Sequence, residues 1–314
     1  SSMQLLKGKL AIDFMSKRRI AMVFSAILLA IALFALITRG LNFGIDFTGG
    51  TLIEVGYPQA VELEPIRNAL ATSGFDGAQV QHFGSSRDVL VRIAPQAEKE
   101  SAQLSEEALA GLRQQNAGVE MRRIEFVGPQ VGEELTEQGA LAMIYALIGI
   151  LIYIMVRFQW RFAPGAVIAL VHDVLIVLGF FAVTQFDFDL TVLAALLAVI
   201  GYSLNDTIVV FDRIRENFRK MRKGSPVDII NTSLNQTISR TLMTSITTLL
   251  VLISLFVFGG EVIHSFSLAL ILGVVVGTYS SIYVASTATL ALGVTKADLM
   301  QTKVESKEGD GSVV

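Results

Sequence analysis

The chain has 314 residues, of which 52% are hydrophobic and only 17% are charged, against about 25% charged residues in an average globular protein. Its apolar residues gather in runs close to the ~20 that a helix needs to cross a bilayer, which excludes a soluble enzyme and predicts an integral membrane protein. The formal net charge of −3 gives no reason to expect a nucleic-acid partner. With no cysteine and only three histidines, the chain has no disulfide or thiolate metal site, and we expect no metal or organic cofactor.

Six apolar runs are long enough to form membrane-spanning helices. They cover about 20–38, 139–156, 163–183, 190–211, 241–258 and 265–287. The first run follows a basic cluster and has no small-residue cleavage pattern behind it, so it predicts a retained anchor rather than a signal peptide. The other five runs predict a five-helix bundle within 136–290.

Basic residues in the loops predict the orientation, because Lys and Arg stay on the cytosolic side. The N-terminal stretch 1–19 is basic, and basic residues recur between spans two and three and between spans four and five. The two opposite loops, 184–189 and 259–264, contain no Lys or Arg. We therefore expect both termini in the cytosol, with a disordered tail over the charged, Gly- and Ser-containing residues 291–314.

The segment 39–135, between the first two spans, is predicted to lie on the external side of the membrane. Its apolar periodicity changes in the order strand, helix, strand, strand, helix, strand. The predicted elements cover 51–57, 61–73, 78–83, 88–93, 98–115 and 119–127. This βαββαβ order is that of a ferredoxin-like α+β domain, a fold that by itself defines no function.

Residues 212–238 are polar and basic but retain regularly spaced apolar side chains. They predict one or two amphipathic helices on the cytosolic surface of the bilayer, with Gly224-Ser225-Pro226 as the break. Such a basic run is most often a positive-inside anchor, and contact with lipid headgroups or a cytosolic partner is the alternative.

Asp173 lies near the middle of the third span, where an unpaired carboxylate is costly. Gly165, Ala169 and Asp173 form one i, i+4 row, so Asp173 is predicted to face a closely packed helix rather than lipid. A structural hydrogen bond to that helix, with His172 as a helper, and a role in proton handling both remain open.

Asp206 lies in the fourth span, in a polar stretch that includes Asn205, and the fifth span begins near Arg240, with Thr244 and Thr248 on the same row. Because the fourth span runs inward and the fifth outward, Asp206 and Arg240 are expected at similar depth. A guanidinium there would hold the carboxylate ionised. A pair that opens and closes would be a proton switch and a permanent pair would be a structural clasp; spacing alone favours neither.

The glycine-rich stretch 44–50 has neither Rossmann nor P-loop spacing, and no strand precedes it. It predicts a tight connection from the first span into the first strand of the α+β domain. A second connection, 128–132, leads into the second span, and both could act as hinges for that domain. The hinge candidates are Asp46, Gly49, Gly50, Gly128 and Pro129.

Two aspartates within the membrane would also suit an aspartyl protease. They lie at different expected depths, however, and neither follows the Gly-x-Gly pattern of that class. The sequence also has no Gly-x-Ser-Gly and no His-Glu-x-x-His. We therefore expect no enzymatic activity.

Several motifs together resemble one family. Asp46-Phe47-Thr48-Gly49-Gly50 is similar to the Asp-Phe-x-Gly-Gly motif of the bacterial SecD/SecF protein-export membrane proteins, and the stretches 124–132, 201–210 and 212–216 are similar to the SecF branch in particular. The resemblance covers about 10–295. It implies membership of the resistance–nodulation–division superfamily and a location in the bacterial inner (cytoplasmic) membrane.

The resemblance also implies one half of a pseudo-symmetric pair with a SecD-like subunit, associated with the SecYEG translocon and often YajC. Such a pair uses protons as the coupling ion and helps to draw unfolded secretory polypeptide out on the periplasmic side. The family's proton-handling residues fall on Asp206 and Arg240, which leaves Asp173 as a secondary candidate. The alternative is a half-transporter that exports a small or lipidic solute, but a single six-span half with about 95 external residues favours protein export.

Overall fold

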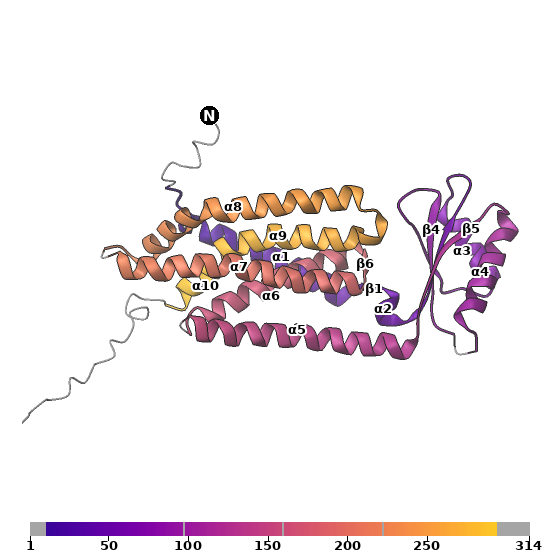
Figure 1. Ribbon diagram of the computed structural model, residues 1–314, viewed down its shortest axis with the longest axis horizontal. Coiled ribbons are helices and arrows are strands. Elements are labelled where there is room, and N and C mark those ends of the chain that lie inside the picture. The colour runs from indigo at the N-terminus through magenta and orange to yellow at the C-terminus, as the bar shows by residue number, and fades with distance from the viewer. Residues whose placement is uncertain (1–10, 97, 159, 222, 294–314) are drawn as a thin grey trace, which may run out of the picture.

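The computed structural model describes residues 11–96, 98–158, 160–221 and 223–293. Within these residues, six helices are long and apolar enough to cross a membrane. They form an elongated bundle, and a separate α/β domain stands at one end of it (Figure 1). The predicted fold class, a six-span helical membrane protein with a ferredoxin-like βαββαβ domain, is confirmed. The predicted disordered tail lies outside the described residues, apart from its first few positions.

The helices of the bundle extend beyond the apolar runs that predict them. They are α1 (Arg18–Thr38) after the short 3₁₀ turn η2 (Met15–Lys17), α5 (Pro129–Arg157), α6 (Ala163–Thr184), α7 (Leu190–Lys220), α8 (Pro226–Phe258), and, after the turn η3 (Glu261–Ile263), α9 (His264–Ile282) and α10 (Val284–Ala291). Helix α5 begins with Pro129 at its first position, where the missing N–H of proline has no cost. The α/β domain therefore ends at Gly128, several residues before the predicted boundary at 135.

The polar segment 212–238 does not form separate surface helices. Its first part continues α7 to Lys220, and its second part begins α8 at Pro226. The break lies where the sequence predicts it, because Ser225 and Asp228 form a capping box at the start of α8.

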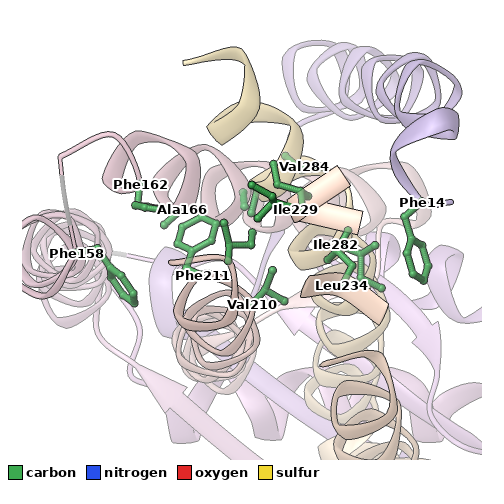
Figure 2. Close-up of a cluster of buried hydrophobic side chains, with 14 of the residues drawn as sticks. Phe14, Phe158, Phe162, Ala166, Val210, Phe211, Ile229, Leu234, Ile282 and Val284 are labelled. Atoms are coloured by element: carbon green, nitrogen blue, oxygen red, sulfur yellow. The ribbon is translucent and has the colours of Figure 1, made fainter. Parts of the chain in front are cut away.

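A cluster of apolar side chains explains this continuity. At the end of the bundle remote from the α/β domain, Ile229 and Leu234 of α8 are buried together with side chains from η2, α5, α6, α7, α9 and α10 (Figure 2). The rings of Phe162 and Phe211 belong to this cluster, and their centroids lie 4.9 Å apart. The apolar face of residues 229–238 is thus covered by protein rather than by lipid headgroups.

The α/β domain has the predicted ferredoxin-like topology. Its strands β2 (Gly50–Gly56), β3 (Gln79–His82), β4 (Asp88–Ile93) and β5 (Glu120–Val127) form one antiparallel sheet in the order β3-β4-β2-β5. Helices α3 (Leu63–Thr72) and α4 (Ser101–Gln115) supply the helical layer. Alternate residues of the central strands, including Ile53, Val55, Val89 and Val91, are at most 1% exposed and pack with Leu70 of α3. Each such side chain contributes about 1.5–3 kcal/mol, so the domain has its own core.

A junction that the sequence does not predict joins the domain to the bundle. Strand β1 (Asn42–Phe43) pairs in parallel with β6 (Asp187–Phe188), which lies between α6 and α7. The single-turn helix α2 (Ile45–Thr48) follows β1 and packs against α5. The connection after the first span is therefore tied to the connection after the third.

Candidate functional site

Asp206 is buried inside the bundle, and one of its carboxyl oxygens has no partner among the described residues. It lies on α7, is 3% exposed, and its Oδ2 atom has no hydrogen-bond partner in the described part of the chain. The hydroxyl of Thr207, the next residue, is also buried without a partner. An ionised carboxylate that is removed from water and left unpaired is strongly disfavoured. This arrangement therefore suits the protonated acid.

Arg240 lies on α8, which packs against α7, but its side chain is exposed. No salt bridge joins it to Asp206, whose carboxyl oxygen Oδ2 is unpartnered. Thr244 and Thr248 are half-buried, and the Thr244 hydroxyl donates to the Arg240 carbonyl at 3.0 Å. Asn205 is exposed. The structure thus places the expected pair on adjacent helices but leaves it open.

A polar link between α7, α8 and α9 lies one turn from Asp206. The Tyr202 hydroxyl donates to Ser245 Oγ at 3.1 Å, and Ser245 Oγ lies 2.6 Å from Thr278 Oγ1. The sequence does not predict the contact between Ser245 and Thr278, because single hydroxyls in apolar helices carry little signal.

Asp173 is the centre of a second, fully bonded cluster. It is 1% exposed, and its Oδ2 accepts hydrogen bonds from Ser203 Oγ at 2.5 Å and Ser280 Oγ at 2.8 Å. Its Oδ1 lies 3.0 Å from Nδ1 of His172, whose Nε2 lies 3.1 Å from Ser25 Oγ. Side chains from α1, α6, α7 and α9 meet here. The expected contact with a neighbouring helix, with His172 beside it, is present.

The glycine ridge of α9 explains why these helices approach so closely. A Cβ on Gly273 would lie 2.1 Å from Val199 Cγ2, and one on Gly277 would lie 3.2 Å from Ser203 Cβ. Small residues at such positions let helix backbones come near each other in a membrane. The approach brings Ser203 and Ser280 within reach of Asp173. Within the described residues, no group of three or more His, Asp or Glu side chains could hold a metal ion.

Asp46 connects the motif after the first span to α7. Its Oδ2 accepts a hydrogen bond from the N–H of Leu190, the first residue of α7, at 3.0 Å. Asp189, the N-cap of the same helix, accepts from the N–H of Val192 at 3.0 Å. Both carboxylates stand at the positive end of the helix dipole. The motif therefore holds the start of the helix that carries Asp206.

The two connections predicted as hinges, 44–50 and 128–132, cross with their backbones in close contact. Gly49 and Gly50 have φ angles of 70° and 123°, which favour glycine. A Cβ on Gly49 would lie 2.9 Å from Pro129 Cα, and one on Gly132 would lie 2.7 Å from the backbone nitrogen of Gly49. Glycine thus serves close packing here, whereas Gly128 has open space around it.

A group of polar side chains, the junction clamp, fixes the open face of the sheet to β1 and β6. Arg92 of β4 donates to the Phe43 carbonyl at 2.5 Å and to Asn42 Oδ1 at 2.6 Å. Asp187 of β6 accepts from Gln81 of β3 at 2.8 Å and from Asn42 at 3.1 Å. Burial lowers the pKa of Arg92, and the negative charge of Asp187 opposes this shift. The orientation of the domain is therefore coupled to the connection that leads into α7.

Together, six spans, a ferredoxin-like domain inserted after the first span and carboxyl groups buried between helices define a polytopic membrane protein of the transport type. The chain matches the family model for the protein export membrane protein SecD/SecF, C-terminal, over residues 107–295, and that for the SecD/SecF GG motif over residues 34–61. The chain belongs to the SecD/SecF family.

Relatives in this family match over nearly their whole length. The chain is 56% identical to the protein translocase subunit SecF of Vibrio alginolyticus, over 98% of this chain and 97% of the relative. It is 50% identical to the protein of the same name from Pseudomonas aeruginosa, over 95% and 97% of the two chains.

Two solved structures of SecDF also resemble it. The crystal structure of SecDF, a translocon-associated membrane protein from Thermus thermophilus, matches with a TM-score of 0.82 and 38% identity, over 90% of this chain and 38% of that one. SecDF in a super-membrane-facing form matches with a TM-score of 0.68 and 37% identity, over 90% and 39%. This chain thus spans about two fifths of the SecDF chains.

Proposed function

We propose that this chain is the SecF-type subunit of a proton-driven complex that assists the translocation of preproteins. Near-complete alignment with subunits named SecF supports this proposal, as does the similarity to SecDF, which is described as translocon-associated. Because the chain spans about two fifths of SecDF, a SecD-like partner would supply the remainder. SecYEG, YajC and unfolded secretory polypeptide are the further partners that this role requires.

The same role requires the bacterial inner membrane, with both termini in the cytosol and the α/β domain in the periplasm. The basic residues of the 1–19 stretch and of the α7–α8 connection support this orientation. The relatives are translocase subunits, which is a non-enzymatic role. Their near-complete alignment disfavours the alternative, a half-transporter for a small or lipidic solute.

Movement of the α/β domain would transmit force to the exported chain. The two SecDF structures match this chain at nearly equal identity and coverage but at different TM-scores, so the arrangement of elements differs between them. In this chain, the junction clamp and Asp46 link the domain to the start of α7. A change in α7 at Asp206 would therefore reach the domain through its own helix.

Asp206 and Arg240 would form the proton switch of this motor. The observation that supports this role is a buried carboxyl oxygen without a partner, on a helix that packs against the helix of an exposed arginine. In this proposal, the conformation described here is the open form, with Asp206 protonated. Release of the proton would leave a charge that Arg240 can pair with, and the pair would close.

The test compares Asp206→Asn with Asp212→Asn. Asp212 is a half-buried aspartate on the same helix that pairs with Arg157 and Arg215. Asn keeps the shape of the protonated acid but cannot titrate. We expect Asp206→Asn to reach the membrane and to co-purify with its SecD-like partner while proton-driven export is lost. Asp212→Asn should export normally, and Arg240→Met should lose export.

Two outcomes would contradict this role. Normal export by Asp206→Asn would mean that Asp206 is not the proton carrier. Loss of membrane abundance and of partner binding, in parallel with export, would indicate a structural clasp instead.

A further inference from the structure

The direction of each hydrogen bond around His172 follows from the chemistry of its partners. The Tyr279 hydroxyl lies 2.7 Å from the Ala21 carbonyl, which can only accept, so the proton of Tyr279 points there. Ser25 Oγ lies 2.8 Å from the Tyr279 oxygen and must therefore donate its own proton to it. With that proton used, Ser25 can only accept from Nε2 of His172. His172 thus carries a proton on Nε2.

The contacts of Asp173 determine how many protons the cluster holds. Its Oδ2 accepts the hydroxyl proton of Ser203 at 2.5 Å. It also accepts that of Ser280 at 2.8 Å, since the other acceptor of Ser280, the Gly277 carbonyl, lies farther away at 3.2 Å. This oxygen therefore carries no proton of its own. Its Oδ1 lies 3.0 Å from Nδ1 of His172, and a hydrogen bond at that position needs a proton. A neutral imidazole with its proton on Nε2 has none on Nδ1. One additional proton must therefore lie between the two atoms, on Oδ1 or on Nδ1.

We propose that His172 and Asp173 form a second proton-binding site, which holds one proton between Nδ1 and Oδ1 in this conformation. Either position of that proton leaves the couple electrically neutral. Neutrality suits side chains that are 3% and 1% exposed within a membrane bundle, where a net charge is expensive. The site goes beyond the role proposed for Asp206 and does not depend on it.

Loss of this proton has a defined structural consequence. Asp173 would become a carboxylate that accepts from Nδ1 of His172, and Nε2 would become an acceptor. Ser25 would then turn its hydroxyl toward Nε2, and Tyr279 would turn its hydroxyl toward Ser25, away from the Ala21 carbonyl. The hydroxyl chain between α1 and α9 therefore reverses its direction when one proton leaves.

Few other ionisable groups surround the couple. On α9, Tyr279 belongs to the chain itself, and its ring lies 5.7 Å from that of Tyr283. On α7, Asp206 lies one turn beyond Ser203. Helix α1 has no ionisable side chain after Arg19, and α10 has none. Helix α5 also packs against α6 and carries Tyr145 and Tyr153, which are both exposed. Asp206 is the buried carboxyl group nearby, so Asp206→Asn is the control.

Nitrogen-15 NMR of histidine tests the proposal directly, because the chain has only three histidines. The full chain carrying His82→Gln and His264→Gln, reconstituted in lipid, reports on His172 alone. We expect a protonated Nε2 at neutral pH and a change to the Nδ1–H tautomer as the pH rises. Asp173→Asn should abolish the change, because its amide oxygen can accept from both serines while its NH₂ group donates to Nδ1, as the protonated acid does.

The controls separate this site from the Asp206 switch. The tautomer change should persist in Asp206→Asn, which leaves both the couple and the hydroxyl chain of Ser25 and Tyr279 in place. Spectra of the chain with unaltered Asp173 test the proposal even if Asp173→Asn does not fold. If the proton lies on Oδ1, infrared spectra should lose one protonated carboxyl band over the same pH range; if it lies on Nδ1, nitrogen-15 spectra should show both ring nitrogens of His172 protonated at neutral pH. An Nδ1–H tautomer at neutral pH, the absence of any tautomer change, or a change that survives Asp173→Asn would each overturn the proposal.

Discussion

Gly49→Ala tests whether the crossing of the two connections is held by close backbone packing. Gly49 has a φ of 70°, and an L-residue in that conformation costs about 1 kcal/mol. Its Cβ would also lie 2.9 Å from Pro129 Cα, and neither atom belongs to a side chain that can turn away. Such overpacking typically adds about 1–3 kcal/mol. We therefore expect a loss of about 2–4 kcal/mol in stability.

Gly260→Ala is the matched control, because Gly260 has a similar φ of 79° with no atom within 4 Å of the added Cβ. It should lose only the conformational part, about 1 kcal/mol. Thermal unfolding of both variants in detergent measures the difference, and limited proteolysis shows whether residues 42–50 and 128–132 open first in Gly49→Ala. Equal destabilisation by the two substitutions would refute the close-packing argument.

Three further predictions concern the helix ends and the core. Asp46→Ala removes a carboxylate from the start of α7 and should cost about 1 kcal/mol, seen as a lower unfolding temperature than that of the exposed control Asp76→Ala. Burial raises the pKa of Asp189, so its ionised carboxylate destabilises the folded state. Asn is an equally good N-cap, and Asp189→Asn should therefore be neutral or stabilising at pH 7. This advantage should vanish as the pH falls through the raised pKa. An Asp189→Asn protein that unfolds earlier than the parent at pH 7 would contradict this sign. Phe211→Ala deletes a fully buried ring that packs on Phe162 and should cost about 3–5 kcal/mol, whereas Phe258→Ala, at 86% exposure, should leave the unfolding temperature nearly unchanged.

Most of the fold could be predicted because its patterns are local. A run of apolar residues predicts a span, and alternation predicts a strand, with no knowledge of the partners. Strand β4 was predicted at its observed bounds, 88–93, and the break between α7 and α8 at its observed place. The boundary of α5 was missed by several residues because its first turns are polar, and polarity was taken as the end of a helix.

The junction between the domain and the bundle could not be predicted because it depends on contacts between distant segments. Strands β1 and β6 have two residues each, too short for any periodicity. Arg92 and Asp187 look like ordinary surface charges in the sequence. Only the fold brings them to the same place, and the function of Asp46 as a partner of Leu190 becomes visible with it.

The two membrane aspartates show the same limit at the candidate site. In the sequence both follow small residues on a helical row, and both suit either a clasp or a switch. The structure separates them by their partners: both carboxyl oxygens of Asp173 have hydrogen-bond partners, whereas Asp206 has a buried oxygen with none. A carboxyl group whose oxygens both have hydrogen-bond partners can exchange a proton only if those partners reorient, so the change stays local. A carboxyl group with a free oxygen can take a new partner when it ionises, and in the proposed switch this partner is Arg240, on another helix. Under that proposal, ionisation of Asp206 has to move a helix or a long side chain, which is the property that a proton-driven motor requires.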